Sequence, residues 1–260
     1  MMSEISILEV RSNDGIEWYC ERQGGGPDMV LIPSGEGDCE NFAKVAAGLA
    51  SSFTVTTFDM PGMSRTKAPE SSMRDITASK LSTQILGLLD ELSIESATFW
   101  GCSSGGLTAL ALAADHPSRV RSVIVHEVPL ASANFPFKTM DDKAAVAACR
   151  TLFATSMCED EGKWNALGPI YHERLEKNYL TWVRTYVNQV ERSFSKEELT
   201  RRPVCWTIGS LTPAGIFFQN VVDGFNAGIP VGLLPSKHFP QVTIPDVLVD
   251  HIKSSATAQI

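Results

Sequence analysis

Apolar and polar positions along the chain alternate with two different periods, which favour strands and helices in turn. Short β-branched runs bounded by turn residues predict strands at residues 5–10, 16–21, 29–33, 53–59, 97–101, 120–127, 204–209 and 230–234. The first two strands flank Asn13-Asp14-Gly15, a turn signal, so we expect them to form a hairpin.

Stretches of helical periodicity lie between these runs. Residues 75–92 carry an apolar stripe, and a second helix is expected to follow Ser103 and to end near residue 116, before Pro117. Later helices are expected at 214–227 and 244–256. Strands that alternate with helices predict an α/β fold with an eight-stranded, mostly parallel sheet flanked by helices.

One stretch interrupts this alternation. Residues 130–200 contain helical segments without a convincing strand and are rich in Phe, Tyr and Trp. We interpret them as a helical cap domain inserted into a core domain of residues 1–129 and 201–260. Most of the aromatic side chains are expected to form the core of the cap, and at least one is expected to line an apolar pocket.

Composition excludes several classes of protein. The 260 residues carry a formal net charge of −8, which leaves no basic excess to neutralise a nucleic acid. The apolar runs are too short for a membrane span, and the first residues do not resemble a signal peptide. Six cysteines without CxxC spacing favour free thiols in a reducing compartment, so we expect a cytoplasmic protein.

The most informative motif is Gly101-Cys102-Ser103-Ser104-Gly105, which matches G-x-S-x-G between a predicted strand and a predicted helix. This context is typical of a nucleophile elbow with Ser103 at its tip and small residues two positions away on either side. Cys102 is interpreted as a packing residue. The alternative is a tight Gly/Ser-rich turn without chemistry.

A serine nucleophile needs a base and an acid. The motif predicts a histidine after the last strand, and His238 is the only one of five histidines in that place. The usual acid is missing, because the loop at 208–213 after the penultimate strand holds no Asp or Glu. Glu127 ends the preceding strand at the same sheet edge as Ser103 and is the expected acid, with Asp223 as the alternative.

Acyl transfer also needs an oxyanion hole. Its donors are expected to be the N–H after the nucleophile, on Ser104, and an N–H from the loop after the third strand. Gly35 lets the backbone of that loop approach a substrate closely, and Gly37 is a competing position.

Metal and cofactor chemistry find little support in the sequence. His126-Glu127 and His172-Glu173 begin like H-E-x-x-H, but neither is followed by the second histidine. No metal site is therefore predicted, and no cofactor is implied. Residues 59–65 are interpreted as a strand-end turn that belongs to the scaffold.

Several segments carry a specific resemblance. They are the serine motif at 101–105, His126-Glu127-Val128-Pro129, Phe58-Asp59-Met60-Pro61-Gly62-Met63-Ser64-Arg65, residues 232–240, and residues 13–19. Together they resemble the fungal zearalenone lactonases, α/β-hydrolases that open the macrocyclic lactone of the mycotoxin zearalenone. The resemblance runs nearly end to end.

The resemblance implies an α/β-hydrolase fold, a Ser103-Glu127-His238 triad, and Gly35 and Ser104 as oxyanion donors. The product of the family is a ring-opened hydroxy acid, which then loses carbon dioxide. A small-molecule lactone is the expected partner, without nucleic acid or membrane, and resemblance alone suggests a homodimer. The alternatives are a lactone-binding receptor with little turnover, a general carboxylesterase, or a hydrolase of carbon–carbon bonds.

Substrate contacts are expected from Ser34 and Gly35 beside the oxyanion hole and from Trp182 and Tyr186 in the cap. Trp182 matches a cap tryptophan of the family that contacts substrate. Two departures touch this region: Ser34 stands where a member of the family has Asp, and the stretch after Trp182 lacks the prolines expected there. Both bear on the preference among zearalenone and its zearalenol relatives.

Overall fold

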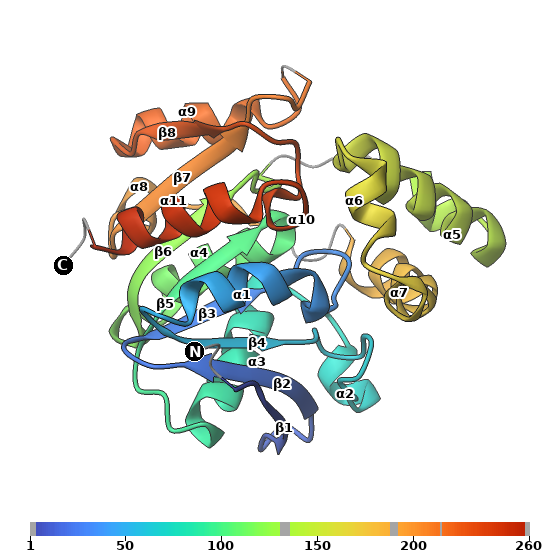
Figure 1. Cartoon of the computed structure of the whole chain (residues 1–260), viewed down its shortest axis with the longest axis horizontal. Helices are drawn as coiled ribbons and strands as arrows, with labels where there is room; N and C mark the ends of the chain where they lie inside the picture. Colours follow the sequence, from blue (N-terminus) through green and yellow to red (C-terminus); the bar gives the residue numbers. More distant parts are fainter. Residues whose placement is uncertain (1–3, 131–135, 188–191, 214, 258–260) are drawn as a thin grey trace.

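The structure is a computed structural model that describes residues 4–130, 136–187, 192–213 and 215–257 (Figure 1). Eight strands form one sheet in the order β1-β2-β4-β3-β5-β6-β7-β8. The antiparallel β1–β2 hairpin continues into an antiparallel β2–β4 pair, and all remaining pairs are parallel. The strands are β1 (Ser6–Arg11), β2 (Glu17–Gly24), β3 (Asp28–Ile32), β4 (Thr54–Phe58), β5 (Ala97–Cys102), β6 (Val120–His126), β7 (Val204–Gly209) and β8 (Val231–Leu234). The predicted sheet is thereby confirmed.

Helices cover both faces of the sheet. Helices α1 (Ala43–Leu49) and α11 (Pro245–Thr257) lie together on one face, and α3 (Ala78–Glu91) and α4 (Ser103–Asp115) lie on the other (Figure 1). Short helices complete the core: η1 (Cys39–Phe42), α2 (Glu70–Met73), η2 (Pro117–Arg119), α9 (Phe218–Ala227) and α10 (Pro240–Thr243). None of the helices in the described ranges is long and apolar enough to cross a bilayer.

Two hydrophobic clusters follow from the period of two along the central strands. On β3, Met29 and Leu31 pack toward α1 and α11, whereas Val30 and Ile32 pack toward α3 and α4. Successive side chains of a strand point to opposite faces, so a continuous apolar run fills both layers. The sheet is therefore buried on both sides, and its carboxyl edge is left for loops.

Helix boundaries differ from the prediction where the backbone leaves the helical region. The predicted helix at 75–92 begins only at Ala78, because Asp75 has φ 49° and the Thr77 side chain caps the helix by accepting from the Lys80 N–H. The helix predicted from residue 214 begins at Phe218, and residue 214 itself lies outside the described residues.

The stretch between β6 and β7 is helical in its described parts. It contains η3 (Pro136–Thr139), α5 (Asp142–Thr151), η4 (Leu152–Met157), α6 (Glu161–Asn165), α7 (Pro169–Thr181), η5 (Trp182–Tyr186) and α8 (Lys196–Leu199), of which η4 and η5 are π-helical. Phe153 lies at its centre, with ring centroids 5.2 Å from Tyr179 and 5.3 Å from Trp182. The division into two domains remains a prediction.

The turn from β5 into α4 depends on very close backbone packing. A Cβ atom on Gly101 would lie 2.4 Å from the carbonyl carbon of Gly105, and one on Gly105 would lie 2.5 Å from the carbonyl oxygen of Ile32. Real side chains do not approach this closely, so both glycines let the helix start directly against the strands.

We expect Gly105→Ala to destabilise the protein by about 1–3 kcal/mol, because backbone atoms must move to admit the methyl group. Gly87→Ala is the matched control in α3: its Cβ would meet only Ser12 Cβ at 3.5 Å, and alanine favours the helix by about 1 kcal/mol. Urea unfolding of both variants measures the difference. Equal stability of the two variants would contradict the packing argument.

Candidate active site

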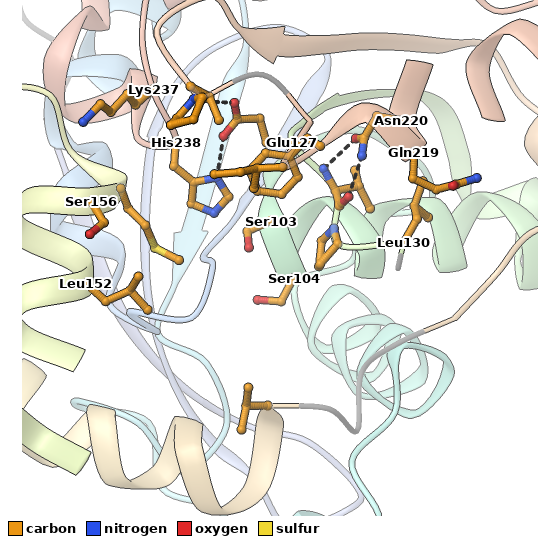
Figure 2. Close-up of a pocket in the computed structure, with 18 of the residues that line it drawn as sticks. Ser103, Ser104, Glu127, Leu130, Leu152, Ser156, Gln219, Asn220, Lys237 and His238 are labelled. Atoms are coloured by element: carbon orange, nitrogen blue, oxygen red, sulfur yellow. Dashed lines mark hydrogen bonds and ion pairs between the residues drawn. The ribbon is translucent and has the colours of Figure 1, made fainter. Parts of the chain in front are cut away.

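Ser103 lies at the tip of the turn between β5 and α4, with φ 53°. A non-glycine residue in the left-handed region is strained, and such strain gathers at functional sites. Figure 2 shows Ser103 beneath the ring of His238 at the carboxyl edge of the sheet. The backbone thus presents the hydroxyl rather than burying it in the helix.

His238 and Glu127 form a buried pair. The Nδ1 of His238 lies 2.7 Å from Oε2 of Glu127, and the two side chains are 4% and 0% exposed (Figure 2). Phe217 stacks on the imidazole with ring centroids 5.1 Å apart. Because Nδ1–H donates to the carboxylate, the Nε2 atom carries the lone pair that a base needs.

Glu127 is held by donors from the neighbouring strand. Its Oε1 accepts hydrogen bonds from the Gly209 N–H at 2.9 Å and from the Thr212 hydroxyl. Burial alone would raise the pKa of Glu127, but the hydrogen bond and the charge of His238 outweigh it and lower the pKa to about 2. The carboxylate is therefore ionised at neutral pH. Its backbone, at φ 46°, is also left-handed.

The Nε2 atom of His238 is buried and has no hydrogen-bond partner among the described residues. It lies on the side of the ring nearest Ser103 in Figure 2. Hydrogen bonds between a nucleophile and its base are often long in ligand-free enzymes and shorten with substrate. The structure thus brings Ser103, His238 and Glu127 to one place, as the sequence predicted.

The alternatives from the sequence lie elsewhere. Asp223 accepts a hydrogen bond from Gln219 on the exposed side of α9. His172 contacts the Trp164 carbonyl oxygen, and His251 lies 3.7 Å from the Cys205 sulfur. His116 ends α4.

His126 is a residue whose role the sequence did not reveal. Its ring is fully buried, with Nδ1 3.0 Å from the Thr207 hydroxyl and Nε2 3.0 Å from the Lys237 carbonyl oxygen. The carbonyl can only accept, so Nε2 carries the proton. Burial lowers the pKa of His126 to about 4. The Cys102 thiol adds a contact to the His238 carbonyl oxygen at 2.8 Å, so both residues hold the loop that carries His238.

An apolar cavity of about 270 Å³ opens above Ser103. Its wall combines apolar side chains of the sheet edge and the helical stretch, among them Val128, Leu130, Leu152, Met157, Trp182, Val187, Ile216 and Phe217. The volume lies just below the range of about 300–1,000 Å³ typical of small-molecule sites. In the ranges that the structure describes, no group of three His, Cys, Asp or Glu side chains is placed to hold a metal ion.

Only some of the predicted oxyanion and substrate residues line the cavity. Ser104 and Trp182 line the cavity. Gly35 is not part of the cavity wall but lies against Trp182, since a Cβ on Gly35 would be 2.6 Å from the indole Nε1. Ser34 and Tyr186 are buried and are not part of the cavity wall; the Tyr186 hydroxyl donates to the Pro61 carbonyl oxygen at 2.7 Å.

Fold and site together define an α/β-hydrolase. The profile of the α/β hydrolase fold matches residues 27–147. An enol-lactonase from Burkholderia xenovorans superposes with a TM-score of 0.77 at 22% identity, covering 96% of this chain and all of that one. Naproxen esterase from Bacillus subtilis gives 0.73 at 17% identity, covering 97% and 91%. These two similarities show the fold.

Sequence similarity is more specific. The zearalenone hydrolase of Cladophialophora bantiana is 42% identical over 94% of each chain. The zearalenone hydrolase of Bionectria ochroleuca is 39% identical over 94% of this chain and 95% of that protein. The chain therefore belongs to the zearalenone hydrolase family of α/β-hydrolases, which confirms the resemblance.

We expect His126 to make stability depend on pH. The unfolded chain binds a proton near pH 6.5 and the folded chain only near pH 4, so the unfolded state is favoured as pH falls through this window. The free energy of unfolding should drop by about 3 kcal/mol between pH 7 and pH 4 relative to a His126→Gln variant, which lacks the titration. Denaturant unfolding at both pH values measures this, and parallel pH profiles would refute it.

Proposed function

We propose that the protein is a serine hydrolase that opens the lactone ring of zearalenone and related resorcylic acid lactones. The observation that carries the chemistry is the buried His238–Glu127 pair at 2.7 Å beside the strained Ser103. The substrate class rests on the two zearalenone hydrolases that match nearly the whole chain. The apolar wall of the cavity suits an apolar ring.

The proposed reaction begins with attack on the lactone carbonyl. Nε2 of His238 takes the Ser103 proton as Oγ bonds to the carbonyl carbon, and the carbonyl electrons move onto oxygen. Glu127 stays ionised and stabilises the imidazolium through Nδ1–H. The tetrahedral intermediate collapses when His238 returns the proton to the ring oxygen. The C–O bond breaks, and the new alcohol remains tethered to the acyl group.

The second half of the reaction repeats these roles with water. His238 removes a proton from water, hydroxide attacks the acyl carbon, and Ser103 leaves with that proton. The product is the ring-opened hydroxy acid. The oxyanion formed in each half is proposed to bind the N–H groups of Ser104 and Gly35, which are fixed before substrate arrives.

The same proposal extends to the cap, the small-molecule partner, the location and the oligomeric state of the protein. The helical stretch at 130–200 acts as the cap over the cavity, and Trp182 supplies its substrate contact. The lactone is the small-molecule partner. A cytoplasmic location is supported by six unpaired cysteines, five of them buried. A homodimer is proposed by family resemblance.

Ser103→Ala should reduce turnover by about 10⁵–10⁶-fold, because the nucleophile is lost. Purified protein is incubated separately with zearalenone and α-zearalenol, and products are followed by chromatography and mass spectrometry. The expected result is many product molecules per protein, with none beyond background in the variant. Product limited to one per protein would favour the receptor alternative, and turnover of simple esters alone would leave only a general esterase.

Glu127→Gln should lower kcat by about 10³–10⁴-fold, since the neutral amide cannot stabilise the imidazolium. Asp223→Asn is the matched control, and its rate should equal that of the unmodified protein because, among the described residues, Asp223 hydrogen-bonds only to Gln219. Steady-state rates of both variants decide the identity of the acid. Full activity in Glu127→Gln with a loss in Asp223→Asn would reverse the assignment.

A further inference from the structure

One face of helix α7 and the first residue of η5 lie directly on the loop that carries Gly35. Arg174, Asn178 and Trp182 follow at intervals of four residues, so they share this face. The Arg174 Nε donates to Oδ2 of Asp38 at 2.6 Å. The indole of Trp182 fills the space above Gly35. The cap therefore packs on the loop through both a charged contact and an aromatic one.

Asn178 makes the central contact of this face. Its side-chain Nδ2 donates to the Glu36 carbonyl oxygen at 2.8 Å and to the Ser64 hydroxyl at 2.7 Å. Its Oδ1 accepts from the Ser64 N–H at 2.8 Å. The residue is 1% exposed, so these bonds replace water completely. An amide is needed, because the site requires a donor and an acceptor on one short side chain.

The other side of the loop is equally constrained. The Ser34 N–H donates to Oε1 of Glu36 at 3.2 Å, and the Gly37 N–H donates to the Ser34 carbonyl oxygen at 3.1 Å. Asn41 also donates to Oε1 of Glu36, at 3.0 Å. Gly35 and Glu36 are the two central residues of the turn that the Gly37 N–H closes. A peptide plane held at its neighbouring residues has little freedom to rotate.

We propose that Asn178 is a positioning residue that sets the direction of the Gly35 N–H, so that the cap helix α7 controls the geometry of the oxyanion hole. This inference rests on the proposed function. Asn178 acts through the Glu36 carbonyl, which shares a peptide with the Gly37 N–H. That N–H donates to the Ser34 carbonyl oxygen, which shares a peptide with the Gly35 N–H. Without the amide, the Gly35–Glu36 segment is tied from one side only, and the donor is no longer aimed at the developing oxyanion.

The consequence is a specific kinetic pattern. The oxyanion exists in the transition state and not in the bound lactone, so misplacement of its donor lowers kcat and leaves KM nearly unchanged. Misplacement by about 1 Å can cost about 100-fold in rate. A purely structural role in holding the cap would instead weaken binding and stability together.

The test compares Asn178→Ala with Glu176→Gln. Glu176 lies on the same helix and, in the described part of the chain, pairs only with Arg150 at the surface, at 2.7 Å, so it is a matched control away from the loop. Rates are measured with zearalenone and with a p-nitrophenyl ester. Affinity for an aryl boronic acid, which forms a tetrahedral adduct with the serine, reports the oxyanion hole directly.

We expect Asn178→Ala to lose about 10–100-fold in kcat on both substrates, with KM within about threefold and boronic acid affinity reduced by a similar factor. Glu176→Gln should match the unmodified protein. Unchanged kcat and boronic acid affinity in Asn178→Ala would overturn the proposal. So would a loss confined to KM, since that indicates a structural role.

Asn178→Asp is the second variant, in case alanine prevents folding. It retains the acceptor for the Ser64 N–H and lacks the donor to Glu36, so it should show the same kcat loss; normal kcat would overturn the proposal. The ester assay separates this result from the proposed function. If zearalenone is not turned over but the ester is, the substrate proposal fails while the Asn178 comparison still stands. If Ser103→Ala retains full ester activity, the triad itself is wrong.

Discussion

The buried hydrogen bond between Glu127 and His238 is the interaction on which the rest of the site depends. A carboxylate taken out of water must be compensated, and three donors do so here: the imidazole, the Gly209 N–H and the Thr212 hydroxyl. Two of them come from β7 and its loop, so the acid of one strand is stabilised by the next. This arrangement fixes the imidazole tautomer and leaves Nε2 toward the cavity.

The positions of these groups follow from parallel strands that end at one edge of a sheet. β5, β6 and β8 deliver Ser103, Glu127 and the loop of His238 to the same rim, while β3 delivers Gly35. The helical stretch then rests on that rim through Asn178, Arg174 and Trp182. The helical stretch and the loop of Gly35 are thus connected through a few direct contacts rather than through the whole chain.

The sequence predicted the eight strands, and it predicted that Ser103, Glu127 and His238 meet at one sheet edge, because both depend on local signals. β-branched runs mark buried strands, and the glycine spacing at 101–105 is required by backbone contacts under 3 Å. The acid could be assigned because the loop at 208–213 lacks a carboxylate. The structure shows why that loop suffices without one: its Gly209 N–H and Thr212 hydroxyl hold a carboxylate supplied from β6.

Other features had no local signal. The roles of His126 and Asn178 depend on partners more than 100 residues away in sequence, Lys237 for one and Ser64 and Glu36 for the other. The interpretation of residues 59–65 as scaffold is incomplete, because Ser64 is bonded to Asn178 of α7. Helix α3 begins three residues later than its periodicity predicts, since periodicity does not reveal the left-handed Asp75.

Ser103 and Glu127 share a backbone feature with a broader meaning. Both have φ near +50°, and each directly follows one of two adjacent strands, β5 and β6, at the same sheet edge. Glycine or asparagine would adopt this conformation more readily than serine or glutamate. Relatives that no longer need catalysis are therefore free to replace either residue with one that suits the turn better. Along such a lineage, loss of activity and gain of stability would arise from the same substitution.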